Sequence, residues 1–555
     1  MATKIVFGNK TISEPGTYSR FKSGINNPPS SLSFGNVILI DTGLGSGYGG
    51  GAIAGTLTNG KAAIQSFSTL TDFKNTIRGG AFNRAAKWLF YPDKNRTVKG
   101  VDNLYFISAK AATPAELTFT FGDHSTSTSI IDGGEIVLQV LNEGTVGNGV
   151  LSGSDLIQGY AGKMRAGVLD NTKYIFDFYV GTYTGTDSDG DPYGDLELTN
   201  CLIPQLIVSS KEVSTISELV TWMNTNATFK QYFKLKTSTV DADSIDATDL
   251  SFYSSSYNLA IGGTETYGST YVTSIIESIG DLDFTFILSD KYATNGKHAY
   301  NASLVEYLAS ARYGQFLIIG GGNDANALTG TNSSTDIAEN FNTTKVVVVH
   351  AGLKKTKIDG SGYKEYDSFI KAAAVTGRIA GLEPQVPGTF KTIDMDADMH
   401  DMKEKERLLA LDKGVLFTKY DSEFGAFIIE QSINTLQNND YLIDAVGDSY
   451  EVSIERIKAQ LNREIIINAK RQLLSQPSGV TRGSLSAATV KTWTEGFLTT
   501  KEVNSSQGLD NLILSFGNVI VSVVGDTYKI DYDFVPNYPV NKLLFTGTIT
   551  DSAIV

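Results

Sequence analysis

Cysteine is almost absent from this 555-residue sequence, which contains Cys201 alone, together with only four histidines. A single thiol cannot form an intrachain disulfide, and it cannot supply a cysteine-rich zinc site or an iron–sulfur cluster. Four scattered histidines leave little for a histidine-based metal centre. We therefore predict no metal site and no cofactor, and we expect Cys201 to be a buried, unreactive thiol.

An excess of positive charge and long hydrophobic runs are missing as well. The chain has 46 Lys and Arg against 60 Asp and Glu, a net charge of −14, so it lacks the field that collects nucleic acid or anionic membrane. No apolar run approaches the roughly 18 residues of a membrane helix, and the first residues lack a secretion signal. We expect no direct nucleic-acid contact, no membrane insertion, and a reducing, soluble compartment.

Proline is scarce, with 12 residues, whereas glycine is plentiful, with 55. This balance favours turns and β-structure, and at roughly 100–200 residues per domain the length predicts several domains. We predict a multidomain chain of the α/β and α+β classes, in which an α/β core carries an inserted β-rich domain and a C-terminal α+β domain with extended terminal arms.

The α/β core is predicted from buried strands that alternate with helices. Short continuous apolar runs occur in FTFIL, FLII and VVVV, which is typical of strands covered on both faces of a parallel sheet. A helix is expected between Thr71 and Tyr91, ending before Pro92. Ser/Thr/Gly-rich alternating strands then interrupt the pattern. We predict five parts: an arm at 1–31, the α/β domain at 32–110 and 266–395, the insert at 111–265, the C-terminal domain at 396–539, and a strand arm at 540–555.

The C-terminal domain is predicted to hold a long helix over about 449–474. One stripe of this helix is apolar, and the opposite stripe is basic, with Arg456, Lys458, Arg463, Lys470 and Arg471. A D-x-x-E signal at Asp401 and Glu404 predicts a short helix before it, and another helix is expected over 486–498. Strands at 518–524, 528–535 and 540–549 would close the chain as a β-meander.

A glycine motif after the first strand invites a nucleotide-binding interpretation. Gly45, Gly47 and Gly50 spell G-x-G-x-x-G, and Asp72 lies near the distance of a ribose-binding acid. The residues that follow, AIAGTLTNGKAAIQ, predict a loop or hairpin where a helix N-terminus is required. We favour a glycine loop, and we interpret Gly320, Gly321 and Gly322 as a turn at the edge of a sheet.

Two acidic runs resemble calcium loops. The first contains Asp187, Asp189, Asp191 and Asp195, and the second contains Asp394, Asp396, Asp398 and His400. Neither has the glycine at position six or the glutamate at position twelve of the helix–loop–helix calcium loop. We favour solvated acidic loops, and an opportunistic cation at the first run stays open.

Enzyme motifs are not evident. His350 follows the VVVV strand at a position where α/β enzymes place catalytic groups, but no nucleophile or carboxylate motif accompanies it. We predict a packed core histidine, no catalytic residue and a protein that is not an enzyme.

Ordered segments over nearly the whole chain resemble the contractile tail sheath proteins of bacteriophages and related injection machines, especially the type of Gram-positive phages and prophages. Pro15-Gly16-Thr17-Tyr18 is similar to the Pro-Gly-x-Tyr of the family's N-terminal arm. The family's Ala-Gly-x-Ile-Ala-Gly segment is similar to AAAVTGRIAGLEPQVPGTFKTI, which begins at Ala372. Its Ile-Asn-Thr-Leu signature is similar to Ile433-Asn434-Thr435-Leu436. DFVPNYPVNKLLFTGTI resembles the terminal strand pair. One departure is Gly388-Thr389-Phe390, where the family usually has Ser-Leu-Thr.

The resemblance implies a structural subunit that forms stacked hexameric rings around a tail tube and contracts to drive the tube through the host envelope for genome delivery. Its terminal arms would add strands to neighbouring subunits. The arm residues implied in this way are Ile5, Phe7, Pro15, Gly16, Tyr18, Val540, Leu543, Phe545 and Ile549. Implied partners are further copies of the chain, the tube protein, and baseplate and terminator proteins. The implied location is the virion tail, assembled in the bacterial cytoplasm.

The basic helix stripe is our hypothesis for tube contact. A positive strip on an acidic chain favours an acidic partner, so Arg456, Lys458, Arg463, Lys470 and Arg471 are the predicted tube-facing residues. A solvated helix face is the alternative. For the whole chain, the alternatives are a nucleotide-binding α/β enzyme with a β-rich insert and a β-rich phage adhesin.

Overall fold

A computed structural model gives the arrangement of most of the chain. It describes residues 5–7, 10–12, 35–41, 64–76, 80–108, 110–120, 135–141, 147–181, 205–238, 256–267, 271–280, 282–289, 297–311, 315–356, 362–437, 442–444, 447–474, 484–503, 511–525 and 527–540.

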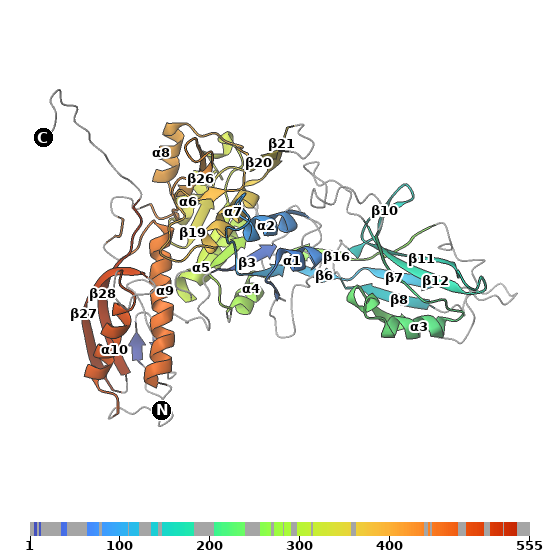
Figure 1. Ribbon diagram of the computed structural model, residues 1–555, viewed down its shortest axis with the longest axis horizontal. Helices are drawn as coiled ribbons and strands as arrows, with labels where there is room; N and C mark the ends of the chain where they lie inside the picture. Colours follow the sequence, from blue (N-terminus) through green and yellow to red (C-terminus); the bar gives the residue numbers. More distant parts are fainter. Residues whose placement is uncertain are drawn as a thin grey trace.

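A seven-stranded sheet forms the centre of the molecule (Figure 1), in the order β24-β19-β18-β17-β3-β5-β4. All neighbours are parallel except β4, which is antiparallel to β5. The apolar runs predicted as buried strands are β17, β18 and β19, in which every residue is buried. The strands are β3 (Asn36–Asp41), β4 (Ile64–Phe67), β5 (Asn103–Ser108), β17 (Phe286–Ser289), β18 (Phe316–Gly320), β19 (Val346–Val349) and β24 (Val415–Leu416).

Helices cover both faces of this sheet. Alternate residues of β3 enter different cores: Leu39 packs with helices α1, α2 and α7, whereas Ile38 packs with α4, α5 and α6. This three-layer arrangement confirms the predicted α/β core. The helices are α1 (Leu70–Thr76), α2 (Gly80–Phe90), α4 (Tyr271–Ile279), α5 (Lys297–Ala311), α6 (Ser334–Phe341), α7 (Ser368–Ala380) and α8 (Glu404–Asp412), with a short 3-10 turn at Ala325–Ala327.

Two small sheets extend the core near α8. The first has the order β21-β20-β23, from β20 (Leu353–Thr356), β21 (Tyr363–Tyr366) and β23 (Ala397–Asp398). The second has the order β22-β26-β25, from β22 (Thr392–Ile393), β25 (Thr418–Asp421) and β26 (Ala426–Ile429).

The β-rich region is joined to the core by a two-stranded neck. β6 (Lys110–Thr113) enters it and β16 (Thr264–Tyr267) leaves it, and the two strands pair antiparallel. Beyond the neck, two antiparallel sheets and α3 enclose a separate apolar core at one end of the long axis (Figure 1). Its elements are β7 (Glu116–Thr120), β8 (Glu135–Val140), β9 (Val150–Ser152), β10 (Asp155–Gln158), β11 (Tyr160–Ala166), β12 (Tyr174–Val180), β13 (Gln205–Ser209), α3 (Ile216–Thr225), a 3-10 turn at Phe229–Gln231, β14 (Phe233–Ser238) and β15 (Asn258–Leu259).

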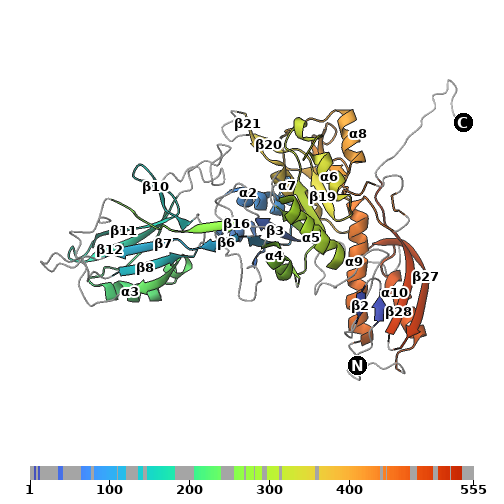
Figure 2. The same ribbon diagram turned by 180° about the vertical axis from the view of Figure 1, so that it is seen from behind.

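The C-terminal helices pack on a β-ribbon at the other end of the molecule, which Figure 2 shows from behind. α9 (Val452–Ala469) continues as a π-helical turn at Lys470–Leu474, and α10 (Ala487–Thr499) follows. Both helices contact the ribbon of β27 (Ile513–Val524) and β28 (Thr527–Pro536). At the start of the chain, β1 (Ile5–Phe7) and β2 (Lys10–Ile12) pair as a hairpin.

Helices α1 and α2 lie in the range Thr71 to Tyr91 predicted as helical, apart from Leu70 at the start of α1, and residues 77–79 between them lie outside the described residues. Two other local predictions need correction. Asp401 does not cap α8, because Lys403 is the N-cap and its backbone N–H donates to Glu406 Oε2 at 2.7 Å. Strand β24 lies in the range assigned to the C-terminal domain, yet it pairs with β19 in the central sheet. The third strand of the predicted meander falls, apart from Val540, outside the described residues.

Candidate assembly interface

The β27–β28 ribbon is long for a two-stranded sheet. Its strands have 12 and 10 residues and pair only with each other among the described strands, apart from a bridge between Glu502 and Ile513. Tyr528, Ile530, Tyr532 and Phe534 alternate along β28 and pack toward the helices. The opposite side chains are exposed, and the outer strand edges leave backbone groups for a further strand.

The N-terminal hairpin is a second isolated pair of strands. Ile5 pairs with Ile12, and Phe7 pairs with Lys10, so two of the predicted arm residues lie in β1. Val540 follows the ribbon and is exposed. The other predicted arm residues lie outside the described residues: Pro15, Gly16, Tyr18, Leu543, Phe545 and Ile549.

The basic stripe of α9 faces inward, which corrects the predicted tube-facing strip. Arg456, Lys458 and Arg463 are 2%, 5% and 4% exposed, and each is bonded within the chain. These three side chains are therefore not available to a tube protein. Lys470 and Arg471, from the same prediction, lie on the exposed π-helical turn.

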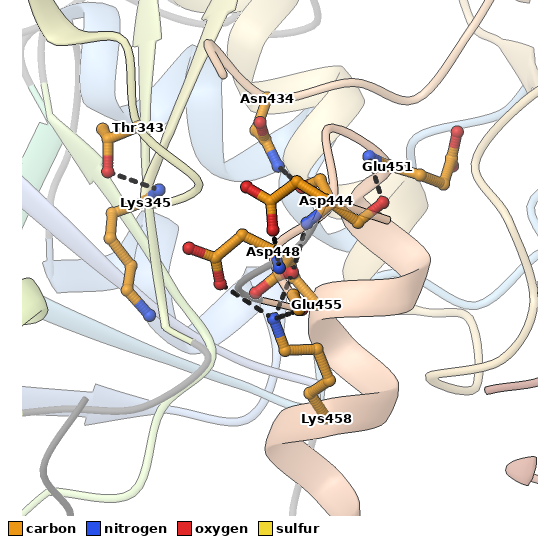
Figure 3. Close-up of polar contacts among 10 residues, drawn as sticks. Thr343, Lys345, Asn434, Asp444, Asp448, Glu451, Glu455 and Lys458 are labelled. Carbon is orange, nitrogen blue, oxygen red and sulfur yellow. Dashed lines mark hydrogen bonds and ion pairs between the residues drawn. The ribbon is translucent and has the colours of Figure 1, made fainter. Parts of the chain in front are cut away.

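Lys458 is the centre of a buried ionic cluster at the start of α9 (Figure 3). Its Nζ donates to Glu455 Oε1 at 2.6 Å, to the Gly447 carbonyl at 2.7 Å and to Asp448 Oδ1 at 3.1 Å. The Ser449 backbone N–H donates to the same Glu455 oxygen at 2.9 Å. Burial raises the pKa of Glu455, while Lys458 opposes that shift. The cluster fixes the entry of the chain into α9.

Arg456 and Arg463 join α9 to the α/β core. Arg456 Nη2 donates to the Leu382 carbonyl at 2.6 Å, just after the end of α7, and its guanidinium lies over the Phe286 ring. Burial lowers the pKa of Arg456 to about 9, so it remains charged at neutral pH. Arg463 forms a buried ion pair with Asp283, which precedes β17. The charges predicted to contact a partner thus orient the helix on its own core.

His350 is part of a buried polar chain. Ser334 Oγ lies 2.7 Å from His350 Nδ1, His350 Nε2 lies 2.9 Å from His400 Nδ1, and His400 Nε2 lies 3.4 Å from Glu406. A neutral His350 that accepts at Nδ1 and donates from Nε2 satisfies this order of donors and acceptors. Burial lowers the pKa of His350 to about 3, with Lys371 and His400 contributing.

The Ser334–His350 hydrogen bond resembles that of a catalytic Ser–His pair, but its surroundings do not. Ser334 and His350 are fully buried, so the hydroxyl is not accessible to a substrate, and His350 is the core histidine that the sequence predicted. Lys371 and Asp398 form a buried ion pair beside it at 2.6 Å. No local pattern indicates that Ser334, Lys371 and Asp398 form one network, because they come from three separate elements.

The glycines after β18 are explained by close packing. A Cβ on Gly321 would lie 2.4 Å from Ser334 Oγ, and one on Gly322 would lie 2.2 Å from Ala327. Close packing of this turn therefore explains the glycines, and no phosphate ligand is needed to account for them. Gly45, Gly47 and Gly50 lie outside the described residues, and the next described element is β4.

The second acidic run is used for ion pairs. Asp394 accepts from Lys355 at 2.8 Å, and Asp396 from Lys94 at 2.8 Å. Within the described part of the chain, no group of His, Cys, Asp and Glu side chains is arranged to hold a metal ion. The first run and Cys201 lie outside that part. Among the described helices, none has the length and apolar character needed to cross a membrane.

No family model matches the sequence. The fold is similar to that of the sheath tail protein from Desulfitobacterium hafniense, with a TM-score of 0.55, 13% identity and coverage of 94% of this chain and 100% of the other. It is also similar to the sheath tail protein from Listeria innocua, with a TM-score of 0.51, 14% identity and coverage of 92% and 97%.

A curated relative matches along almost the same length in sequence. The tail sheath protein of Bacillus phage SP01 is 21% identical over 549 residues, which cover 89% of this chain and 90% of the relative. In sequence and in fold, the chain is therefore similar to tail sheath proteins.

Proposed function

We propose that this chain is a structural tail sheath protein that polymerises as stacked hexameric rings around a tail tube, linked by strand exchange through its chain ends. Contraction of the polymer would drive the tube through the host envelope for genome delivery. Tube, baseplate and terminator proteins would be its partners in the virion tail, after assembly in the host cytoplasm. The proposal includes no nucleic-acid contact and no membrane insertion.

The observation that carries this proposal is the β27–β28 ribbon. Two-stranded sheets are marginal alone, and long unpaired edges accept strands from other chains. The ribbon is anchored on α9 and α10 by its inner face, so its edges are held in position for an incoming arm. At about 1 kcal/mol net per hydrogen bond, four or five bonds would hold an arm by roughly 5 kcal/mol.

The N-terminal hairpin supports the same mechanism. β1 and β2 pair with each other and with no third strand in the described part of the chain, so they are a natural donor for a neighbour's edge. Of the five basic residues predicted to face the tube, Lys470 and Arg471 are the two proposed to contact it, because the other three are buried.

Electron microscopy of the purified protein tests this function. The full chain is expected to form hollow tubes with sixfold symmetry, and a variant lacking residues 1–12 is expected to stay monomeric with an unchanged thermal unfolding midpoint. The matched control is Arg471→Glu, which should self-assemble normally because it alters only the proposed tube contact. A full chain that stays monomeric at high concentration, or a truncated chain that assembles as well as the full chain, would contradict the proposal.

A further inference from the structure

The neck loses its strand pairing at the point where it enters the β-rich region. β6 and β16 pair along their whole lengths, and the two chain segments meet again in a bridge between Glu116 and Ile261. In between lie Pro114, which has no backbone N–H, and Gly262, whose φ of 81° is in the left-handed region. The ladder is therefore interrupted between the neck and the β-rich region.

This interruption has the properties of a hinge. A Cβ on Gly262 would meet nothing within 4 Å, so no neighbouring atom packs against this position. The apolar core of the β-rich region shares no residue with the cores on the two faces of the central sheet. Hinges between rigid parts are a few residues that absorb changes of φ and ψ. Residues 114–115 and 262–263 occupy that place here.

The side chain of Asn148 spans the interruption. Its Nδ2 donates to the Gly263 carbonyl at 2.8 Å, and the Gly263 N–H donates to its Oδ1 at 2.7 Å. A side-chain amide offers a donor and an acceptor, as a peptide group does, so Asn148 takes the place of the missing strand partner. Gly263 is buried, and buried backbone groups without partners are costly. Rotation of the backbone at Gly263 therefore breaks two bonds.

Asn148 is fixed to the body of the β-rich region, on the far side of the interruption from the neck. A Cβ on Gly159 would lie 1.9 Å from the Asn148 carbonyl oxygen, so the two backbones are in contact. The next residue, Gly149, donates its N–H to the Ala260 carbonyl at 2.7 Å. The amide of Asn148 thus connects the rigid body of the region to the first residue outside β16.

We propose that residues 114–115 and 262–263 form a hinge between the β-rich region and the α/β core, and that Asn148 is the latch that holds this hinge in one position. With both bonds formed, the region keeps one orientation relative to the central sheet (Figure 1). With both bonds broken, the region rotates on the neck. The hinge belongs to a single copy of the chain, so it does not depend on the proposed polymerisation.

Two variants of the full chain test the latch. Asn148→Ala removes both bonds, and Asn148→Asp keeps an acceptor for the Gly263 N–H but loses the donor to the carbonyl. Asn226→Ala is the matched control, because it removes a hydrogen bond of 2.8 Å from the Phe229 N–H inside the region itself. Hydrogen exchange, followed by mass spectrometry of peptides that contain Gly263, and small-angle X-ray scattering are measured on dilute, unassembled protein.

Faster exchange and a wider range of shapes are expected when the latch is removed. In Asn148→Ala, the amides of residues 263–264 should exchange at least about tenfold faster than in the unmodified chain. Its scattering should give a broader distribution of interatomic distances, while the thermal unfolding midpoint of the chain stays within a few degrees. Exchange in Asn148→Asp should lie between these two proteins. The control should match the unmodified chain at these amides and in scattering.

Three results would overturn the proposal. Unchanged exchange at residues 263–264 in Asn148→Ala would mean that the side chain does not hold the junction. Faster exchange with unchanged scattering would mean that the junction does not act as a hinge. If Asn148→Ala does not fold, an Asn148→Asp chain that exchanges and scatters like the unmodified chain would leave Asn148 with a role in folding alone.

Discussion

At the scale of single residues, α9 shows that an amphipathic pattern does not identify the solvent side of a helix. Arg456, Lys458 and Arg463 have the spacing of a basic surface stripe, yet they bond to the α7 end, to Asp448 and Glu455, and to Asp283. Charges can be buried when each finds partners, and the buried pairs then fix one orientation of the helix. Nothing in the local sequence indicates that those partners converge.

His350 gives a pH-dependent prediction at this scale. Its pKa is lowered from 6.5 to about 3 in the folded chain, so protonation favours the unfolded state as the pH falls below about 6.5. Between pH 7 and pH 5 this single group should lower the free energy of unfolding by about 2 kcal/mol. Urea unfolding at pH 7 and at pH 5 measures the free energy of unfolding of both proteins. Between these two pH values, the decrease should be about 2 kcal/mol smaller in His350→Asn than in the unmodified chain.

The difference between the two proteins isolates His350 from the other titrating groups. Parallel pH dependences would contradict this account, since they would mean that the imidazole does not titrate between the folded and unfolded states.

At the scale of elements, glycines set how closely α7 approaches its neighbours. A Cβ on Gly377 would lie 2.5 Å from the Trp88 carbonyl and 2.6 Å from the Leu89 carbonyl, both at the end of α2. The Ala-Gly segment used for the family resemblance therefore has a packing role, because it brings α7 against the backbone of α2.

Two glycines in helices allow a matched test of this packing. Gly377→Ala should lower the free energy of unfolding by about 1–3 kcal/mol through overpacking, despite the better helix propensity of alanine. Gly496→Ala in α10, where a Cβ meets nothing within 4 Å, should raise it by about 0.5–1 kcal/mol. Chemical denaturation measures the free energy of unfolding of both variants. A Gly377→Ala chain that is more stable than the unmodified chain would show that α7 and α2 move apart at little cost.

At the scale of the whole molecule, a two-stranded neck joins the β-rich region to the α/β core in the described part of the chain. β6 and β16 pair at the neck, where the Thr113 and Thr264 hydroxyl oxygens are 2.7 Å apart. Its apolar core shares no residue with the cores on the two faces of the central sheet. This separation supports the predicted insert, whose boundaries remain a prediction.

Excision of the insert tests that division. Replacing residues 114–263 by Asn-Gly, which favours a tight hairpin turn between β6 and β16, should leave a folded, monodisperse chain. Its thermal unfolding midpoint should lie within a few degrees of the parent's, as followed by circular dichroism. An excised chain that aggregates or loses its cooperative transition would mean that the insert and the core stabilise each other.

Part of the fold was predictable because its signal is local. β17, β18 and β19 are short continuous apolar runs, and such runs predict strands buried on both faces whatever their neighbours are. The helices around 452–469 and 487–499 were also predicted, from their apolar periodicity. The resemblance to tail sheath proteins rests on ordered motifs, since these persist at a level of identity where no single motif is specific.

The candidate site was less predictable because it depends on contacts between distant segments. Ser334, His350 and His400 come from three elements, and Asn148 and Gly263 lie 115 residues apart in the sequence. Sequence spacing placed none of these pairs.

The sequence alone determined the element types, the acidic charge, the lack of a disulfide framework and the resemblance to tail sheath proteins. The tertiary structure decided which face of α9 is buried, which polar side chains share a core, and which apolar side chains remain exposed. The physical reason is that secondary structure follows from near neighbours in the chain, whereas burial of a charge or exposure of an aromatic ring depends on what other segments pack against it.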